Sequence, residues 1–260
     1  MQKSNPQENS KRKKSWILDG FMIMNKFELD LPEQASSATI TNHDINDIFE
    51  DDMKFFTNLT ELNLKDNNKI PMYKLLSLPA LEKLNLSFNK IHNLAILPIH
   101  IEGQEAHPKL FTCGNIKTPF KTLKFLNLSF NKLDFISLER LVMLQGSLKS
   151  LDISGNDLDS IPKDFKYFDC LESLNLSNNW FMNSKENILW ITKSEMGLEY
   201  SSCRIFDILS RIRSLKYLNL SKNLLKGKLD INIFRNFYWW WNFQLWKIYF
   251  PKPSRARFEL

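Results

Sequence analysis

Glycine is scarce in this chain, with seven residues among 260. None of the motifs GxGxxG, GxxxxGKS/T, HExxH or GxSxG occurs, so the sequence offers no familiar phosphate loop, zinc-protease helix or serine-hydrolase elbow. Cysteine is scarcer still, and Cys113, Cys170 and Cys203 form an odd set at wide spacings. That set fits neither a disulfide framework nor a CxxC zinc site and is typical of a reducing compartment. We therefore expect a protein that is not an enzyme and that holds no cofactor or metal.

Long uncharged hydrophobic runs are absent too. The most apolar stretch, residues 231–250, contains Arg235 and Lys247, and a membrane-spanning helix needs about 18 to 20 apolar residues. Residues 16–24 are apolar but are broken by Asp19 and Gly20, which makes a poor secretory signal. We expect no transmembrane span and no secretion, and hence a cytoplasmic and nuclear protein.

Positive charge is concentrated at the two ends of the chain. The net charge is +6, although residues 16–225 are slightly acidic. Such a body argues against nucleic-acid binding by a face of its own. In the basic flexible leader, residues 1–15, the run Lys11, Arg12, Lys13 and Lys14 fits a nuclear import signal, a phosphate-contacting arm or a solubilising tail.

What the sequence has in abundance is one repeated pattern, LxxLxLxxN. Six copies begin at Leu59, Leu81, Leu123, Leu148, Leu171 and Leu215. Steps of 22, 25 and 23 residues fit single leucine-rich repeats, whereas steps of 42 and 44 indicate insertions at about 95–122 and 181–214. A degenerate first repeat, residues 35–58, has Ala35, Ala38 and Ile40 at the leucine positions and His43 at the asparagine position. Atypical terminal repeats are normal in such arrays.

The spacing of the leucines dictates the geometry of each unit. In LxL the two leucines point to one side of a short strand and the residue between them points to the other. One unit cannot bury its leucines alone, but a stack shares a continuous core. For residues 16–230 we predict an α/β fold, a right-handed leucine-rich repeat solenoid with a parallel concave sheet and a partly helical convex side. Apolar periodicity predicts helices at 137–144, 205–212 and the acidic stretch 44–52.

The polar residues of the pattern fall into two columns. The ladder asparagines are expected to face inward and to satisfy backbone groups at the bend after each strand, with His43 as a substitute in the first repeat. They are Asn67, Asn89, Asn131, Asn156, Asn179 and Asn223. The outward strand face is small and polar, and its predicted partner-binding residues include Asn85, Asn127, Asp152 and Asn175.

Aromatic residues stand out against that polar face. Phe125 and Tyr217 share one outward column, and Phe88 and Phe130 each precede a ladder asparagine. Exposed rings on a rigid surface are typical of protein-binding hot spots. We predict that a protein partner docks there on a monomeric solenoid. The alternative is that Phe88 and Phe130 only pack against each other along the sheet edge.

Short segments narrow the comparison with known families. They are Leu18-Asp19-Gly20-Phe21 with Met22 and Met24, Pro79-Ala80-Leu81-Glu82-Lys83-Leu84 with Phe88-Asn89, and Leu126-Asn127-Leu128-Ser129-Phe130-Asn131. Over about residues 16–225 the chain resembles the X-ray radiation resistance-associated family of leucine-rich repeat proteins. The resemblance implies a non-enzymatic scaffold of the nucleus and cytoplasm, linked to the response to ionising radiation and without catalytic residues. Two alternatives stay open: a nucleic-acid-linked damage-response factor that uses the basic leader, and a ciliary or cytoskeletal scaffold.

Residues 231–260 form an aromatic C-terminal segment that no repeat logic explains. Trp239, Trp240 and Trp241 are consecutive, and seven further rings lie nearby. We interpret the segment as a cap over the open end of the last repeat. The alternatives are a chain end that is not a native fold element and a segment that lies on a membrane surface.

Overall fold

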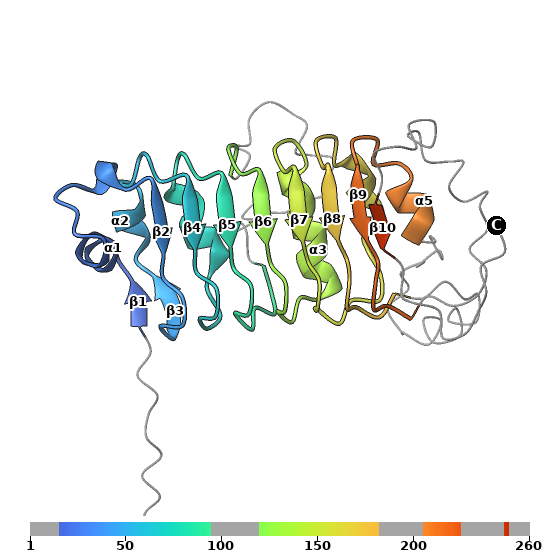
Figure 1. Ribbon diagram of the computed structural model, residues 1–260, viewed down its shortest axis with the longest axis horizontal. Coiled ribbons are helices and arrows are strands. Elements are labelled where there is room, and N and C mark those ends of the chain that lie inside the picture. The colour runs from blue at the N-terminus through green and yellow to red at the C-terminus, as the bar shows by residue number, and fades with distance from the viewer. Residues whose placement is uncertain (1–15, 95–119, 182–204, 225–246, 250–260) are drawn as a thin grey trace, which may run out of the picture.

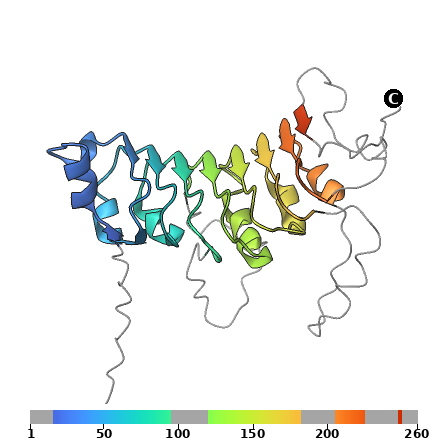
Figure 2. The same ribbon diagram turned by 60° about the horizontal axis from the view of Figure 1, so that its bottom comes forward.

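The molecule is an elongated stack of short units. In the computed structural model, the described residues are 16–94, 120–181, 205–224 and 247–249. Within them, short strands line one side and helical segments lie on the other (Figure 1, Figure 2). The basic leader, the larger part of both expected insertions and all but three residues of the aromatic C-terminal segment lie outside the described residues.

The strands form one parallel sheet in the order β10-β9-β8-β7-β6-β5-β4-β2. Each repeat contributes its strand at the LxL segment, and equivalent residues pair in register, as Leu62 pairs with Leu84 and Leu84 with Leu126. The strands are β2 (Ser37–Thr39), β4 (Glu61–Asn63), β5 (Lys83–Asn85), β6 (Phe125–Asn127), β7 (Ser150–Asp152), β8 (Ser173–Asn175), β9 (Tyr217–Asn219) and β10 (Lys247–Tyr249). The predicted parallel solenoid sheet is confirmed.

The leucines of the pattern fill a single core behind the sheet. Leu62, Leu84 and Leu126 are each 2% exposed, and the leucines two positions later are fully buried. The degenerate first repeat contributes β2, whose central residue Ala38 occupies the position that a leucine takes in later repeats. Because every unit buries its apolar side against its neighbours, the core is continuous along the stack.

Helical segments cover the side of the core that faces away from the sheet (Figure 2). The two helices expected there are present: α3 (Phe135–Leu141), which continues into the 3₁₀ turn η4 (Val142–Leu144), and α5 (Ile205–Leu209). Two further 3₁₀ segments, η2 (Met72–Ser77) and η5 (Lys163–Tyr167), take the same place in repeats whose return stretch is shorter. Asp134 caps α3 by accepting the Ser137 backbone N–H at 2.7 Å.

The N-terminal end of the stack has its own small sheet. Strand β1 (Trp16–Leu18) pairs in parallel with β3 (Ile45–Ile48), and helix α1 (Gly20–Lys26), the turn η1 (Pro32–Gln34) and helix α2 (Glu50–Met53) complete the unit. The expected helix over 44–52 is therefore wrong in its first half. Ile45 and Ile48 are buried at helical spacing, but this segment forms a strand because its backbone pairs with β1.

The ladder asparagines bind each repeat to the one before it. All six are at most 8% exposed. Asn131 is representative: its Oδ1 accepts the backbone N–H groups of Asn89 (2.9 Å) and Ile91 (3.0 Å), and its Nδ2 donates to the Leu86 and Leu128 carbonyls. His43, in the same column, does not take the inward place expected for it: its ring is exposed and contacts the Thr41 carbonyl of its own turn at 2.5 Å. Each ladder asparagine, as Asn131 shows, thus satisfies backbone groups of two repeats that would otherwise be buried without partners.

Replacing Asn131 with alanine should destabilise the fold by about 3 kcal/mol, because several buried backbone donors and acceptors lose their partner at once. The loss is measured by chemical denaturation of the whole chain. Asn127 is the matched control, since it lies half-buried on the strand face and its Oδ1 accepts one N–H, that of Ser129. Asn127→Ala should cost less than about 1 kcal/mol; equal losses for the two variants would contradict the ladder's role.

Candidate interaction surface

The strand face presents a row of small polar side chains. The central row consists of Asn63, Asn85, Asn127, Asp152, Asn175 and Asn219, which are half-buried. In each, Oδ1 accepts the backbone N–H two residues further on, which fixes the side chain. Asp152 also accepts Nδ2 of Asn175 at 3.0 Å. Four predicted partner-binding residues, Asn85, Asn127, Asp152 and Asn175, therefore lie side by side as a rigid polar strip.

Phe125 and Tyr217 lie in the column at the strand starts but are not neighbours. Phe125 is on β6 and Tyr217 on β9, with β7 and β8 between them. Both rings are exposed, 42% for Phe125 and 48% for Tyr217. Lys83 Nζ lies 5.8 Å from the Phe125 ring centroid and forms an ion pair with Glu61.

Phe88 and Phe130, by contrast, are brought into contact. Their ring centroids are 4.6 Å apart and their planes differ by 13°. They remain 42% and 46% exposed, so mutual packing does not bury them. Although 42 residues separate them in the chain, they belong to adjacent repeats because β5 pairs directly with β6. We refer to Phe88 and Phe130 as the aromatic pair.

The backbone at both residues of the aromatic pair is left-handed. The φ angle is 60° at Phe88 and 53° at Phe130. The residue before the ladder asparagine has a positive φ in the other repeats too, where it is Asp66, Gly155, Asn178 or Lys222. Glycine, asparagine and aspartate tolerate this conformation best, whereas a bulky aromatic residue in it is a genuine outlier.

Gly155 continues the column beyond Phe130. Its φ is 64°, and a Cβ atom placed on it would lie 2.7 to 3.1 Å from three adjacent carbons of the Phe130 ring. Nearly equal distances to adjacent ring carbons put that position over the ring face. The glycine therefore suits the left-handed backbone, and it is required for the space that the Phe130 ring occupies.

Lys65 lies over the face of Phe88 that is turned away from Phe130. Its Nζ lies 5.3 Å from the Phe88 ring centroid, within the range of a cation–π contact. Lys65, Phe88, Phe130 and Gly155 thus follow one another across four successive repeats, although Lys65 stands one position before the column, which Asp66 occupies in that repeat. The rings stack against one another and expose their edges.

Trp180 is a surface aromatic residue that sequence reasoning missed. It follows ladder residue Asn179, its Nε1 donates to Asp157 Oδ1 at 2.8 Å, and the side chain is 50% exposed. The available signal was its position directly after the ladder, at the same edge of the sheet as the aromatic pair. The predicted import residues Lys11, Arg12, Lys13 and Lys14 lie outside the described residues.

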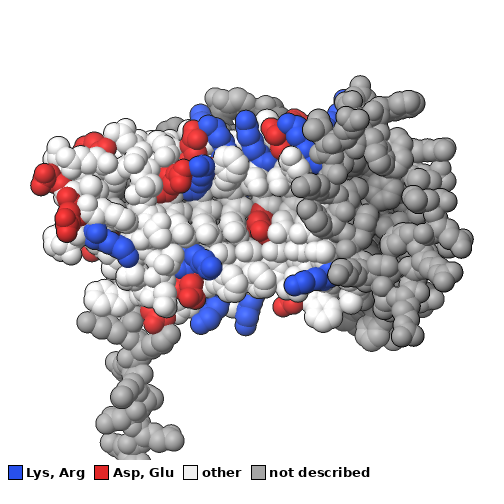
Figure 3. All heavy atoms as spheres, viewed as in Figure 1, with Lys and Arg blue, Asp and Glu red and all other residues white. Residues whose placement is uncertain are grey.

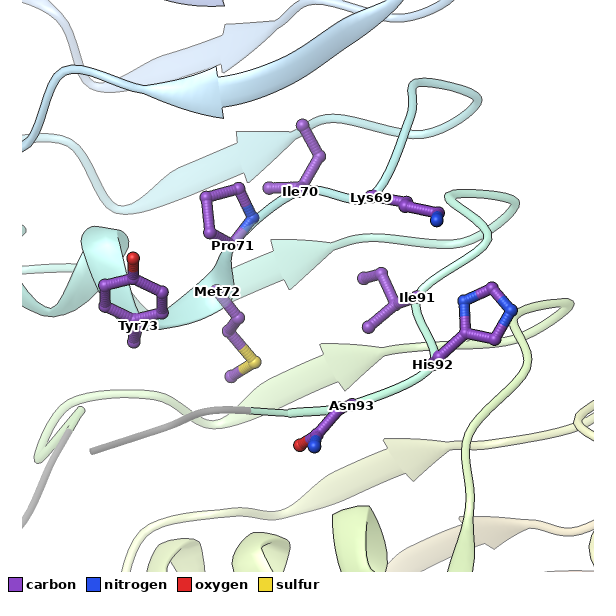
Figure 4. A pocket seen from close by; sticks show the side chains of 8 residues that line it. All are labelled: Lys69, Ile70, Pro71, Met72, Tyr73, Ile91, His92 and Asn93. Carbon is purple, nitrogen blue, oxygen red and sulfur yellow. The ribbon is translucent and has the colours of Figure 1, made fainter. Parts of the chain in front are cut away.

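A pocket of about 340 Å³ opens between two neighbouring return loops (Figure 4). Its lining consists of Lys69, Ile70, Pro71, Met72, Tyr73, Ile91, His92 and Asn93. These residues offer one imidazole, one phenol and one ammonium group, but no carboxylate or thiol. Among the described residues, no three histidine, cysteine, aspartate or glutamate side chains gather closely enough to hold a metal ion.

Comparisons with known proteins agree with the architecture. Two family profiles, both described as Leucine Rich Repeat, match residues 78–99 and 147–168. The chain is a leucine-rich repeat solenoid. An internalin (inlF) of Listeria monocytogenes is similar at a TM-score of 0.53 and 17% identity, over 85% of this chain and 48% of that one. A leucine-rich repeat protein of Leptospira interrogans is similar at 0.50 and 20%, over 82% and 48%.

One curated relative agrees with the resemblance seen in the sequence. The solenoid is 25% identical over 208 residues to X-ray radiation resistance-associated protein 1 of Mus musculus, which covers 80% of this chain and 24% of that protein. The chain thus spans about a quarter of the length of the mouse relative. Leucine-rich repeat domains are in general protein-binding scaffolds rather than enzymes. No helix in the described part of the solenoid is long and apolar enough to cross a membrane.

Gly155→Ala should destabilise the solenoid by about 2 kcal/mol, because alanine is strained at a positive φ and its Cβ collides with Phe130. Gly146 is the matched control, since a Cβ there meets no atom within 4 Å. Gly146→Ala should be neutral or stabilising by up to about 1 kcal/mol. Denaturation midpoints measure both effects, and adding Phe130→Ala to Gly155→Ala should recover the steric part of the loss. A Gly155→Ala variant as stable as the wild type would refute the packing described for Phe130.

Proposed function

We propose that the solenoid is a non-enzymatic scaffold that binds a protein partner on its strand face, with the aromatic pair as anchor. The supporting observation is that two phenylalanine residues occupy left-handed backbone positions while nearly half of each side chain is in water. The fixed polar strip beside them, which includes Asn85, Asn127, Asp152 and Asn175, supplies the rim of the proposed surface. Phe125 and Tyr217 extend it toward the opposite edge.

The energetics of the aromatic pair favour a role in binding over a role in folding. A left-handed conformation costs a residue with a side chain about 1 to 2 kcal/mol, and the pair contains two such residues. One stacked ring contact contributes about 0.5 to 1.5 kcal/mol, which does not offset both costs. Asparagine or glycine, as found at the equivalent positions Asn178 and Gly155, would suit the backbone better. Locally unfavourable residues that stay exposed are typical of functional sites.

The biological setting is proposed from the mouse relative. Its printed name concerns resistance to X-ray radiation, and we extend from it a radiation-response role in the nucleus and cytoplasm. A nucleic-acid-linked role for the basic leader is the second candidate, favoured by the run from Lys11 to Lys14. The polar strip on the strand face, whose one charged residue is the acidic Asp152, favours the protein-binding role for the solenoid itself. A ciliary or cytoskeletal scaffold is a further candidate, because the same stacked repeats would serve it.

Replacing both Phe88 and Phe130 with asparagine should abolish partner capture while leaving stability unchanged or up to about 1 kcal/mol higher, because asparagine relieves the left-handed backbone. Tagged wild-type and variant chains are used for affinity capture from cells, and the captured proteins are quantified by mass spectrometry. Thermal denaturation of the purified chains supplies the stability comparison.

Ile136→Ser is the control for lost apolar surface. Ile136 is 55% exposed and lies on α3, on the opposite side of the molecule from the sheet. This variant should retain the partners that the Phe88→Asn, Phe130→Asn variant loses. If the double variant keeps its partners but unfolds at a markedly lower temperature, the rings are structural and the proposed anchor is wrong.

Replacing Lys11, Arg12, Lys13 and Lys14 with alanine should shift a fluorescently tagged chain from the nucleus toward the cytoplasm, because import receptors recognise clustered basic side chains. The nuclear fraction is measured by microscopy in living cells. An unchanged nuclear fraction would remove the import role from this segment, and loss of binding to DNA or RNA in the same variant would favour the second candidate function.

A further inference from the structure

We propose that the aromatic pair and the lysines around it select a short acidic segment of a protein partner, in which carboxylates flank an apolar side chain. This inference rests on the proposed protein-binding function and specifies the chemistry of the partner. Two observations support it: the lysines at the two edges of the sheet differ in ion pairing, and the two rings are stacked face to face.

Four exposed lysines stand at the edge where the strands end. They are Lys65, Lys69, Lys90 and Lys132, here called the basic edge. Lys90 and Lys132 each lie two residues after a member of the aromatic pair, in neighbouring repeats. Lys69 belongs to the preceding repeat, and its backbone N–H donates to the Asn89 carbonyl. Among the described carboxylates, none forms a salt bridge with any of the four.

Three lysines at the opposite edge, where the strands begin, form ion pairs. Lys83 pairs with Glu61 at 2.5 Å, Lys124 with Glu82 at 2.6 Å and Lys216 with Glu172 at 2.7 Å. The hydrogen bond from Lys216 lowers the pKa of Glu172, so that carboxylate is ionised at neutral pH. Figure 3 shows charged side chains along both edges of the face and mostly uncharged surface between them. Three lysines on this edge are therefore paired, although Lys149 beside them has no salt bridge with a described carboxylate, whereas all four lysines of the basic edge are unpaired.

The nearby described acidic groups form no salt bridge with the basic edge, and two of them hold neutral donors instead. Asp134 Oδ1 accepts the backbone N–H and the hydroxyl of Ser137 at the start of α3, and Asp157 Oδ1 accepts Trp180 Nε1. Asp66, in the column of the aromatic pair, forms no salt bridge with a lysine of the basic edge. A patch of positive charge that surrounds an apolar contact is complementary to carboxylates around an apolar side chain.

The stacking of the rings favours a peptide over a nucleobase. One face of Phe88 lies under Lys65 and the other against Phe130, while the second face of Phe130 lies over Gly155. Bases bind aromatic platforms through ring faces, and here those faces are covered. The exposed ring edges carry partial positive charge, which suits carboxylate and carbonyl oxygens as well as aliphatic groups.

The size of the patch fits a short extended segment. The basic edge and the aromatic pair span the repeats of β4, β5 and β6, and neighbouring strands lie about 4.8 Å apart. The patch is therefore roughly 10 to 15 Å long, which corresponds to about four extended residues. One apolar residue over the ring edges, with acidic residues before and after it, occupies that length.

Two labelled peptides test the proposal by fluorescence anisotropy with the full chain. The acidic probe has the sequence GSEDLEFDEGS, and its neutral counterpart is GSQNLQFNQGS. The acidic probe should bind at least about tenfold more tightly at low salt, and the difference should shrink as salt is added. Lys90→Gln with Lys132→Gln should remove most of the preference. Lys65 is left intact because it also covers the Phe88 ring.

Lys124→Gln with Lys216→Gln is the matched control, since it removes the same number of charges from the paired edge. It should keep the preference for the acidic probe. The proposal is overturned if neither peptide binds, if the preference is absent, or if it survives Lys90→Gln with Lys132→Gln. It is also overturned if labelled oligothymidylate binds more tightly than the acidic probe and depends on the same two lysines.

The Phe88→Asn, Phe130→Asn variant separates this inference from the proposed function. If that variant loses both peptides while the wild type shows no acidic preference, the aromatic anchor stands and the acidic specificity falls. If both peptides bind the variant as they bind the wild type, the aromatic pair is not the docking site, and the inference falls together with the proposed anchor.

Discussion

The register between successive repeats is the constraint on which the rest of this structure depends. Each ladder asparagine binds backbone groups of its own turn and of the turn before it, as Asn131 does with Leu128 and Leu86. The leucines alone would bury apolar surface in several registers, since hydrophobic contact is non-directional. The buried amides admit one register, because a slip would leave their donors and acceptors unpaired. Every column of side chains on the strand face follows from that alignment.

The same register explains how a 42-residue step in the sequence leaves the surface uninterrupted. Strand β5 pairs with β6 as closely as any other neighbours, and the Asn89 N–H donates to Asn131 Oδ1 across the step. Phe88 and Phe130 are therefore adjacent in space, although a whole additional repeat of sequence separates them. No strand stands between β5 and β6, so the sheet continues directly from one to the other.

Much of this architecture is predictable from leucine and asparagine spacing, because the residues at those positions are the ones whose side chains face the core. The sequence presents partner binding and mutual packing of Phe88 and Phe130 as alternatives, because spacing does not show that two rings can stack and still remain nearly half exposed. The pairing of β1 with β3 was missed because Ile45 and Ile48 fit helical spacing equally well, and only a distant segment decides between the two. The lysine pairing was also hidden: Lys83 and Lys90 look alike in the sequence, and only their neighbours in adjacent repeats distinguish them.

A solenoid that fixes its surface so firmly recognises a partner by placement rather than by adjustment. The central amides are held by the backbone two residues on, the rings are held by one another and by Gly155, and the core behind them is continuous. Little conformational entropy remains to be lost at such a surface on binding, so a modest contact area suffices for affinity. The free chain is destabilised by two phenylalanine residues with a left-handed backbone and by lysines that have no carboxylate partner among the described residues. In the proposed complex, a partner that covers the ring edges and supplies carboxylates would offset that cost.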